Sequence, residues 1–415
     1  MNKRLALALT LVFLAAGFAL AFAAVAASQA FSNVLIIPAA QKEALLARFA
    51  SAPAGQLFLF RWNYAVILAG LALAGAGFWF LRTFNRHSER SRRVTKLLLT
   101  EYRPLVILVA TAAVFAALSS RFFTVGNFTN ILKQISHYAI LAAGVYFAIL
   151  LGGIDISVGS VLAFSGAMAA LIISRMPASP WSAALAVLAA LAIGMAAGFF
   201  NGFFIARFRL QPMIVTLATL SIFRGATLVL IGGAAVSIAG TRYAGAPVFN
   251  ALGQATLLGG YLPVPIILMA AVFAVVYFVL NHTAFGRHMY AIGGNEEASL
   301  LSGIDVVRTK MLAYTASGLM AGIAGIIITA RVASATPTAG QSYEMDAIAA
   351  VVIGGTSLRG GEGKVLYTIV GALIIGMLNN IQTLMGVDSY FQTIIKGAVI
   401  LLAVLLDART GRNQR

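Results

Sequence analysis

Long apolar runs dominate this chain, and several of them exceed 18 residues, the length that indicates a membrane-spanning helix. Inside a bilayer the backbone must satisfy its own hydrogen bonds, so only helices and closed β-barrels can cross it. A barrel would show segments of about ten residues in which apolar and polar side chains alternate, and the sequence has no such alternation. We therefore expect an all-α polytopic protein embedded in a lipid bilayer.

Composition excludes several other classes of protein. Only 10% of the residues are charged, whereas about 25% is usual in soluble domains. The absence of cysteine rules out disulfide frameworks, thiolate metal sites and cysteine nucleophiles. The four histidines do not pair with acidic residues at helical spacing, so we expect no metal site. We attribute the net charge of +17 to basic loops that orient the helices in the membrane, and we expect no nucleic-acid partner.

Twelve segments are candidate membrane spans. With the N-terminus inside, the inner segments and inner helix ends hold 19 of the 29 Lys and Arg residues, and this asymmetry supports the orientation. The span 345–357 is unusually short. The candidate spans are 5–27, 57–81, 104–120, 131–151, 157–174, 181–205, 213–231, 263–280, 309–330, 345–357, 365–384 and 391–406.

The composition changes near residue 100, which predicts two parts. Residues 1–96 read as a transmembrane hairpin followed by a basic cytoplasmic linker, and residues 97–415 as one continuous ten-helix unit. The first apolar run is about 23 residues long, whereas the apolar core of a signal peptide has 7–15. We favour a retained helix, and a signal peptide cleaved within residues 1–30 is the alternative.

The most informative motif is the stretch from Gly152 to Ser160. Its glycines and Ser157 allow a helix to break, and the carboxylate of Asp155 is costly near membrane depth, so the segment must line protein or water. One interpretation is a break beside a translocation path. The alternative is a short inner turn in which Asp155 caps the next helix. The path residues taken from this motif are Gly152, Gly153, Asp155, Ser157 and Gly159.

Two further polar positions lie inside predicted spans. Arg224 is about 16 Å into its span at 1.5 Å per residue, where an arginine needs a partner; Asp155 or a backbone carbonyl would serve. Arg224 and Asn380 complete the set of candidate path residues. The alternatives are that Arg224 only stabilises the packing of its helix and that Asn380 forms a hydrogen bond between helices.

A short helix is predicted in the inner loop 281–308. Asn295 suits its N-cap, Glu296 and Glu297 complement the positive end of its dipole, and Gly303 suits the position after its C-terminus. Such a short helix is marginal alone, so it must pack against the protein's own inner face or against a cytoplasmic partner. The candidate partner-contacting residues are Gly293, Gly294, Asn295, Glu296, Glu297, Leu300, Leu301 and Gly303.

Two glycine-rich stretches of the chain resemble each other. The stretch from Leu150 to Gly159 is similar to the stretch from Val352 to Gly361, which indicates either a duplicated half or a chance likeness.

The sequence Gly361-Glu362-Gly363-Lys364 is not a P-loop, because Leu358 replaces its first glycine and Val365 its final Ser or Thr. We therefore expect no nucleotide site on this chain.

Over residues 102–407 these motifs together resemble the permease subunits of ribose-type sugar ABC importers, which serve ribose, xylose, arabinose and galactose. The resemblance rests on the Gly152–Ser160 stretch, the loop 281–304, Asn201-Gly202, Thr216-Leu217-Ala218-Thr219 with Arg224-Gly225, and Ala347–Gly355 with Gly360-Gly361. It implies the ten-helix transmembrane domain of type II importers. Residues 1–96 are an addition to the usual family chain.

The resemblance also implies a transporter made of several different subunits in the bacterial inner (cytoplasmic) membrane. Two permease chains, identical or different, form the pore, and two cytoplasmic ATP-binding subunits hold ATP and Mg²⁺ and drive transport. A periplasmic sugar-binding protein delivers solute near the loop 232–262. The chain itself would be a non-catalytic subunit without cofactors. Relatives in the family move autoinducers, nucleosides or branched-chain amino acids, so one alternative is a permease for such a solute. A second alternative is a secondary transporter, which needs no ATPase. The sequence does not name the sugar.

Overall fold

The computed structural model describes residues 102–401, apart from 120, 123, 177, 241, 258–261, 389 and 400. The predicted hairpin and linker of residues 1–96, and the domain boundary predicted at residue 97, lie outside the described residues. The chain divides into two compact units, Met1–Thr124 with Thr383–Met385, and Val125–Gln382 with Gly386–Arg415. In the first unit, helix α6 (Arg103–Leu118) starts with a proline in its first turn, where no intrahelical N–H is needed.

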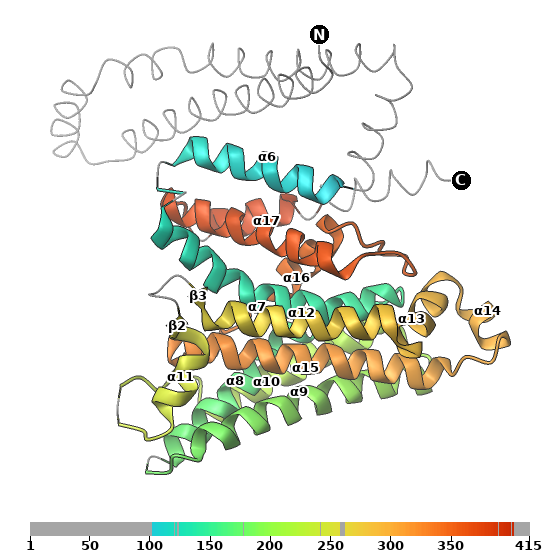
Figure 1. Cartoon of the computed structure of the whole chain (residues 1–415). Coiled ribbons are helices and arrows are strands. Elements are labelled where there is room, and N and C mark those ends of the chain that lie inside the picture. The colour runs from blue at the N-terminus through green and yellow to red at the C-terminus, as the bar shows by residue number, and fades with distance from the viewer. Residues whose placement is uncertain are drawn as a thin grey trace, which may run out of the picture. The chain divides into compact units, whose positions relative to one another are not determined.

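The second unit is a bundle of helices, drawn in Figure 1. The labelled helices of this unit are α7 (Val125–Leu150), α8 (Val158–Arg175), α9 (Ser182–Arg207), α10 (Pro212–Ile231), α11 (Ala246–Gln254), α12 (Val264–His282), α13 (Ala284–Gly294), α14 (Glu296–Leu301), α15 (Val306–Val332), α16 (Tyr343–Ile353) and α17 (Val365–Leu384). Residues 390–399 form a further helix, which carries no label.

Two short antiparallel ribbons accompany the helices. Strand β1 (Val236–Ser237) pairs with β4 (Ser334–Ala335), and β2 (Thr256–Leu257) pairs with β3 (Leu262–Pro263). In Figure 1, α13 and α14 lie at one end of the bundle, and α11 with the β2–β3 ribbon lies at the other. In the orientation predicted from the charge distribution, the α13–α14 end is the inner one. The loops predicted to meet an ATPase and a binding protein are therefore at opposite ends.

Six of the described helices are long and apolar enough to cross a membrane: α8, α9, α10, α12, α15 and α17. The predicted spans from 104–120 to 365–384 each coincide with a helix, although α7 begins six residues before the predicted start at 131; span 391–406 is helical where it is described up to residue 399, and its predicted end lies outside the described residues. Helix α7 has 26 residues, but its first half is more polar because it carries Lys133, Gln134 and His137. Helix α16 has 11 residues, about 16 Å at 1.5 Å per residue, which is half of a 30 Å hydrocarbon core. The segment predicted as a short span at 345–357 is therefore a helix, but it is too short to cross the membrane by itself.

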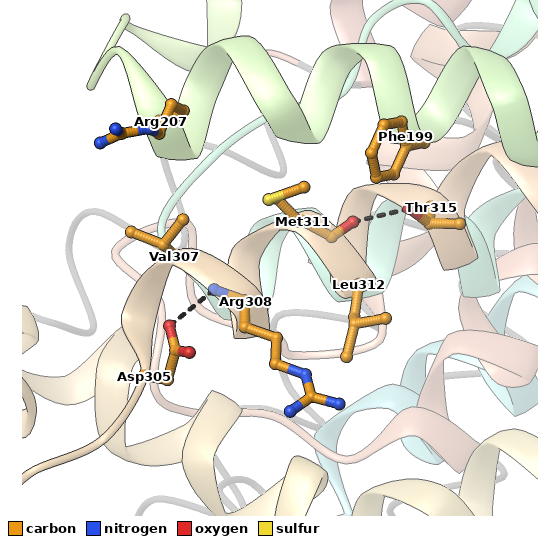
Figure 2. Close-up of a pocket in the computed structure, with 8 residues that line it drawn as sticks. All are labelled: Phe199, Arg207, Asp305, Val307, Arg308, Met311, Leu312 and Thr315. Atoms are coloured by element: carbon orange, nitrogen blue, oxygen red, sulfur yellow. Dashed lines mark hydrogen bonds between the residues drawn. The ribbon is translucent and has the colours of Figure 1, made fainter.

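Helix α15 lies at the centre and packs closely against α9. A Cβ atom on Gly318 would lie 2.6 Å from the nitrogen and 2.8 Å from the Cα of Gly198, and a Cβ on Gly202 would lie 2.8 Å from the Cα of Met311. Small residues allow such close backbone approach, which drives helix association where the lipid is as apolar as the side chains. Beside this contact, a groove of about 490 Å³ opens between the inner ends of the two helices (Figure 2).

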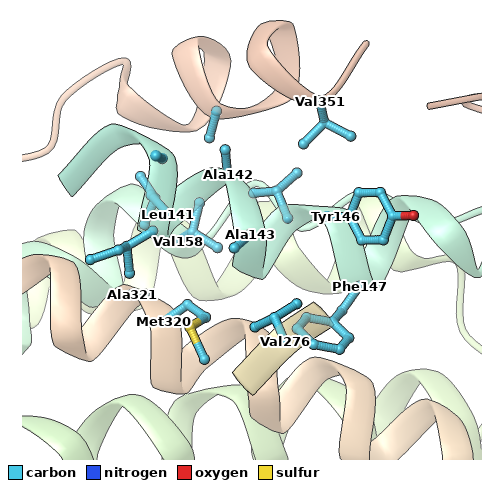
Figure 3. Packing of buried hydrophobic residues seen from close by; sticks show 14 of the residues in the cluster. Leu141, Ala142, Ala143, Tyr146, Phe147, Val158, Val276, Met320, Ala321 and Val351 are labelled. Atoms are coloured by element: carbon cyan, nitrogen blue, oxygen red, sulfur yellow. The ribbon is translucent and has the colours of Figure 1, made fainter. Parts of the chain in front are cut away.

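The main hydrophobic core surrounds the second half of α7. Side chains of this helix, including Leu141, Tyr146 and Phe147, pack against α8, α12, α15 and α16 (Figure 3). Tyr146 is fully buried, and its hydroxyl lies 3.0 Å from that of Tyr290 in α13. Hence the core fixes α13, and with it the start of the inner loop, relative to α7.

Candidate translocation and coupling sites

Asp155 lies in the non-helical connection between α7 and α8 and is fully buried. Its Oδ1 accepts hydrogen bonds from the backbone nitrogen and the hydroxyl of Ser157, at 3.0 and 2.6 Å. Its Oδ2 accepts one from the Ser317 hydroxyl of α15, at 2.8 Å. Asn201 of α9 donates to the Ser157 hydroxyl at 2.8 Å. This network joins the connection to two long helices without a basic side chain.

The network places Asp155 well inside the bundle. Ser317 is 11 residues past Val306, the first residue of α15, and so about 16 Å along that helix. Helix α7, by contrast, ends at Leu150 near the inner end. Residues 151–157 therefore run from the inner end of α7 to a start of α8 that lies inside the bundle. They are the break that the glycines and Ser157 predicted.

Gly153 lies on this segment at a crowded place. A Cβ atom there would overlap the hydroxyl of Tyr314 and lie 3.1 Å from Cγ of Pro212. Only a residue without a side chain passes between α10 and α15 at this point. Gly152 has a φ of +75°, a backbone conformation that glycine adopts without strain.

A second non-helical segment enters from the other end of the bundle. It leaves α15 at Val332, and by Gly340 it has reached α8, where a Cβ on Gly340 would lie 3.1 Å from Cδ2 of Leu162. A Cβ on Gly159 would overlap the carboxylate of Glu344 in the first turn of α16. The starts of α8 and α16 thus meet inside the bundle.

Arg224 holds this second segment. Its guanidinium donates to the carbonyl oxygens of Pro337 and Ala339, at 3.2 and 2.6 Å. A non-helical backbone at membrane depth needs such partners. Of the two partners considered for Arg224, the backbone carbonyl is confirmed; Asp155 bonds Ser157 and Ser317 instead.

Three separate segments meet at the inner end. The amide of Gly361 donates to the Leu150 carbonyl at 2.9 Å. A Cβ on Gly293, in the last turn of α13, would overlap that same carbonyl and the Gly361 nitrogen. The hydroxyl of Tyr290 also bonds the Gly363 carbonyl at 3.0 Å. We call Leu150, Gly293 and Gly361 the inner junction. It joins both of the similar glycine-rich stretches to the base of the inner loop.

Helix α14 projects beyond the inner junction. The Asn295 side chain caps it by accepting from the Ala298 nitrogen at 2.9 Å, and Gly303 follows with a φ of +81°, so both predicted helix ends are confirmed. Glu296 forms an ion pair with Lys310 of α15 at 2.7 Å. Leu300 and Leu301 are 56% and 89% exposed. The helix therefore exposes two leucine side chains on the surface of this chain.

Asn380 forms a reciprocal amide pair with Asn127 of α7, with hydrogen bonds of 2.8 and 2.9 Å. It therefore makes the helix–helix contact that was one of its two interpretations. Sequence reasoning named Asn201 only as part of a family-like motif and did not select Ser317 or Glu344, because single polar residues in apolar helices resemble ordinary packing positions. In the part of the chain that the structure describes, no three metal-ligating side chains gather.

Comparison with known proteins decides the family. Residues 127–404 match the family model described as the branched-chain amino acid transport system permease component. The ribose import permease of Escherichia coli K12 is 47% identical over 316 residues, which cover 76% of this chain and 96% of that protein. That of Bacillus subtilis 168 is 43% identical, covering 79% and 99%. The chain belongs to this permease family.

Other relatives support the same placement. The L-arabinose permease of E. coli K12 is 38% identical over 76% of this chain and 92% of its own length, and the D-allose permease of the same strain is 37% identical over 79% and 97%. No solved structure matches the chain. The predicted resemblance to ribose-type sugar importer permeases is confirmed. The chain is a non-catalytic permease subunit of the bacterial inner membrane, and ATP hydrolysis belongs to a separate ATPase subunit.

Proposed function

We propose that this chain forms the solute path of an ATP-driven importer that takes up ribose or a closely related sugar. The observation that carries this proposal is the similarity to two ribose import permeases over 96% and 99% of their length. Two copies of this chain, or this chain and a similar one, would enclose the path with the ten-helix fold of type II importers. Cytoplasmic ATPases and a periplasmic binding protein complete the assembly.

The breaks at 151–157 and 333–342 support a path at this place. Non-helical segments that meet inside a bundle of membrane helices are a recurring feature of transporter solute sites, because backbone groups freed from helices face a cavity or protein. We assign the shaping of the path to Gly152, Gly153, Asp155, Ser157 and Gly159. Asp155 does so by fixing the connection to α9 and α15. Arg224 acts on the second segment, and Asn380 holds α17 against α7.

Helix α14 is the proposed contact with the ATPase. Its exposed Leu300 and Leu301 suit an apolar groove on a partner. Its base is held at the inner junction through Gly293, so a movement of α14 reaches α7 and the loop after α16. An ATPase changes access to a path only through an element that both proteins hold in two states.

The test is co-purification of the full-length chain with the ATPase and binding protein encoded beside it. ATPase activity is measured with and without ribose-loaded binding protein. We expect an intact complex whose ATPase rate rises severalfold with the loaded binding protein. Stimulation by binding protein loaded with a nucleoside or a branched-chain amino acid, and not with ribose, would reject the sugar. Uptake by the permease alone, driven by an ion gradient, would reject the ATP-driven class.

A further inference from the structure

The groove between the inner ends of α9 and α15 is separate from both sites described above. Five of its lining residues are apolar or uncharged: Phe199, Val307, Met311, Leu312 and Thr315. The other three are Arg207, Asp305 and Arg308. Phe199, Val307 and Leu312 are between 39% and 50% exposed, so no other described residue covers the apolar wall.

Polarity in the groove changes along the direction of the helices. Arg207 ends α9, and Asp305 and Arg308 lie at the start of α15, so the charged groups are all at the inner mouth (Figure 2). Phe199 lies eight residues before Arg207, which is about 12 Å deeper at 1.5 Å per residue. A charged mouth above an apolar floor of this depth matches one leaflet of a bilayer, whose hydrocarbon half is about 15 Å thick.

The charge at the mouth favours an anion. Arg207 and Arg308 extend on either side of the groove (Figure 2), and Arg209, two residues beyond α9, is also exposed. Asp305 is the single acidic group in the lining, and one of its carboxylate oxygens accepts from the Arg308 backbone nitrogen at 2.9 Å. Lys310 is engaged with Glu296. Within residues 102–401, as far as the structure describes them, neither Arg207 nor Arg308 forms an ion pair, and guanidinium groups bind phosphate well.

We propose that this groove binds an anionic phospholipid of the inner leaflet, with the headgroup phosphate between Arg207 and Arg308 and an acyl chain along Phe199, Met311 and Leu312. Basic pockets between helices on the cytoplasmic side are suited to such headgroups. The lipid would hold the start of α15 against the end of α9. Because Asp305 and Arg308 directly follow α14 in the chain, lipid occupancy also steadies the attachment of the ATPase-contacting helix. The proposal rests on the membrane orientation and is independent of which sugar is carried.

The test uses the full-length chain in detergent, with native mass spectrometry and thermal unfolding. The probes are phosphatidylglycerol, phosphatidylcholine with the same acyl chains, and inorganic phosphate alone. We expect at least a fivefold preference for phosphatidylglycerol over phosphatidylcholine and a rise of several degrees in the unfolding temperature. Inorganic phosphate alone should produce neither effect. The double variant R207Q/R308Q should lose the preference. Arg175, an exposed arginine in the last turn of α8 at the outer end, supplies the matched control R175Q, which should keep it.

A second variant covers the case in which the double variant fails to fold. Leu312→Trp retains both arginines and fills the groove, and it should also reduce phosphatidylglycerol binding severalfold. Equal binding of the two lipids by the wild type, or an unchanged preference in both groove variants, would overturn the proposal. If phosphate alone reproduces the stabilisation, the site binds free anions and not lipid. If R207Q/R308Q keeps its lipid preference but no longer binds the ATPase, the groove is a docking surface for that protein and the proposal fails.

Discussion

The backbone amide of Gly361 donates a 2.9 Å hydrogen bond to the carbonyl oxygen of Leu150, the last residue of α7. These residues are 211 positions apart in the chain, and Gly293 packs against both of them. The bond uses a carbonyl that the end of the helix leaves free. The contact joins α7, the loop after α16 and the base of α14, so it links the proposed ATPase contact to the helices around the proposed path.

Replacing Gly293 by Ala should disrupt this junction. The new Cβ would overlap the Leu150 carbonyl and the Gly361 amide, and overpacking of this kind costs about 1–3 kcal/mol. We expect a lower unfolding temperature and a loss of ATPase stimulation, measured on the purified complex. Gly294 is the matched control, because a Cβ there has no neighbour within 4 Å. Equal behaviour of G293A and G294A would show that the junction is not tightly packed.

Gly153 and Tyr314 should behave as a coupled pair. Gly153→Ala places a Cβ on the Tyr314 hydroxyl, so we expect slower uptake at normal expression, and Gly153→Leu should be more severe. Tyr314→Phe removes that hydroxyl and should partly restore uptake when combined with Gly153→Ala, because contacting residues couple in double-mutant cycles. Additive effects of the two changes on uptake and thermal stability would contradict the packing described here, and wild-type uptake in Gly153→Leu would exclude a close-packed role.

Asp155→Ala should destabilise the break between α7 and α8. It leaves the hydroxyls of Ser157 and Ser317 without their acceptor in a buried place, and each unsatisfied group costs about 1–3 kcal/mol. Thermal unfolding in detergent measures the loss. Ser317→Ala removes one donor and should cost less than Asp155→Ala. A stability equal to the wild type in Asp155→Ala would show that this network does not hold the connection.

The N-terminal residues 1–96 should be accessory. They precede the part of the chain that matches the family model, which begins at residue 127. A chain that starts at residue 97 with new inside-positive charges should insert, assemble and transport at near wild-type rates. Uptake in whole cells and complex yield after purification are the measurements. Loss of uptake with normal insertion and assembly would give these residues a direct role in transport.

Local features were predictable from the sequence, and contacts between distant segments were not. The cap at Asn295 and the helix end at Gly303 depend on a few neighbouring residues, and both were predicted. The break after Leu150 was predicted for the same reason. That Asp155 bonds Ser317 and that Arg224 bonds the carbonyls near Ala339 depend on how helices far apart in the chain pack. Serine and small residues in apolar helices give no signal that distinguishes such partners from ordinary packing.

Coupling through α14 is tested by Leu301→Asp. Leu301 is the most exposed apolar side chain of this helix, so a charge there should leave the fold intact and weaken an apolar contact with the ATPase. We expect weaker assembly or loss of ATPase stimulation, with binding-protein docking at the outer face preserved. Leu301→Met keeps an apolar side chain of similar size and should behave as the wild type. If Leu301→Asp and alanine substitutions across residues 295–302 are all silent, α14 is not the coupling element.

The most direct measurement of the central claim is uptake of radiolabelled ribose into proteoliposomes that contain the full-length chain and its ATPase. ATP is enclosed inside the vesicles and binding protein is added outside. We predict accumulation that requires ATP, the binding protein and the permease together, and that excess unlabelled ribose abolishes. Ribose entry that proceeds at the same rate without ATP or without the binding protein would contradict the account.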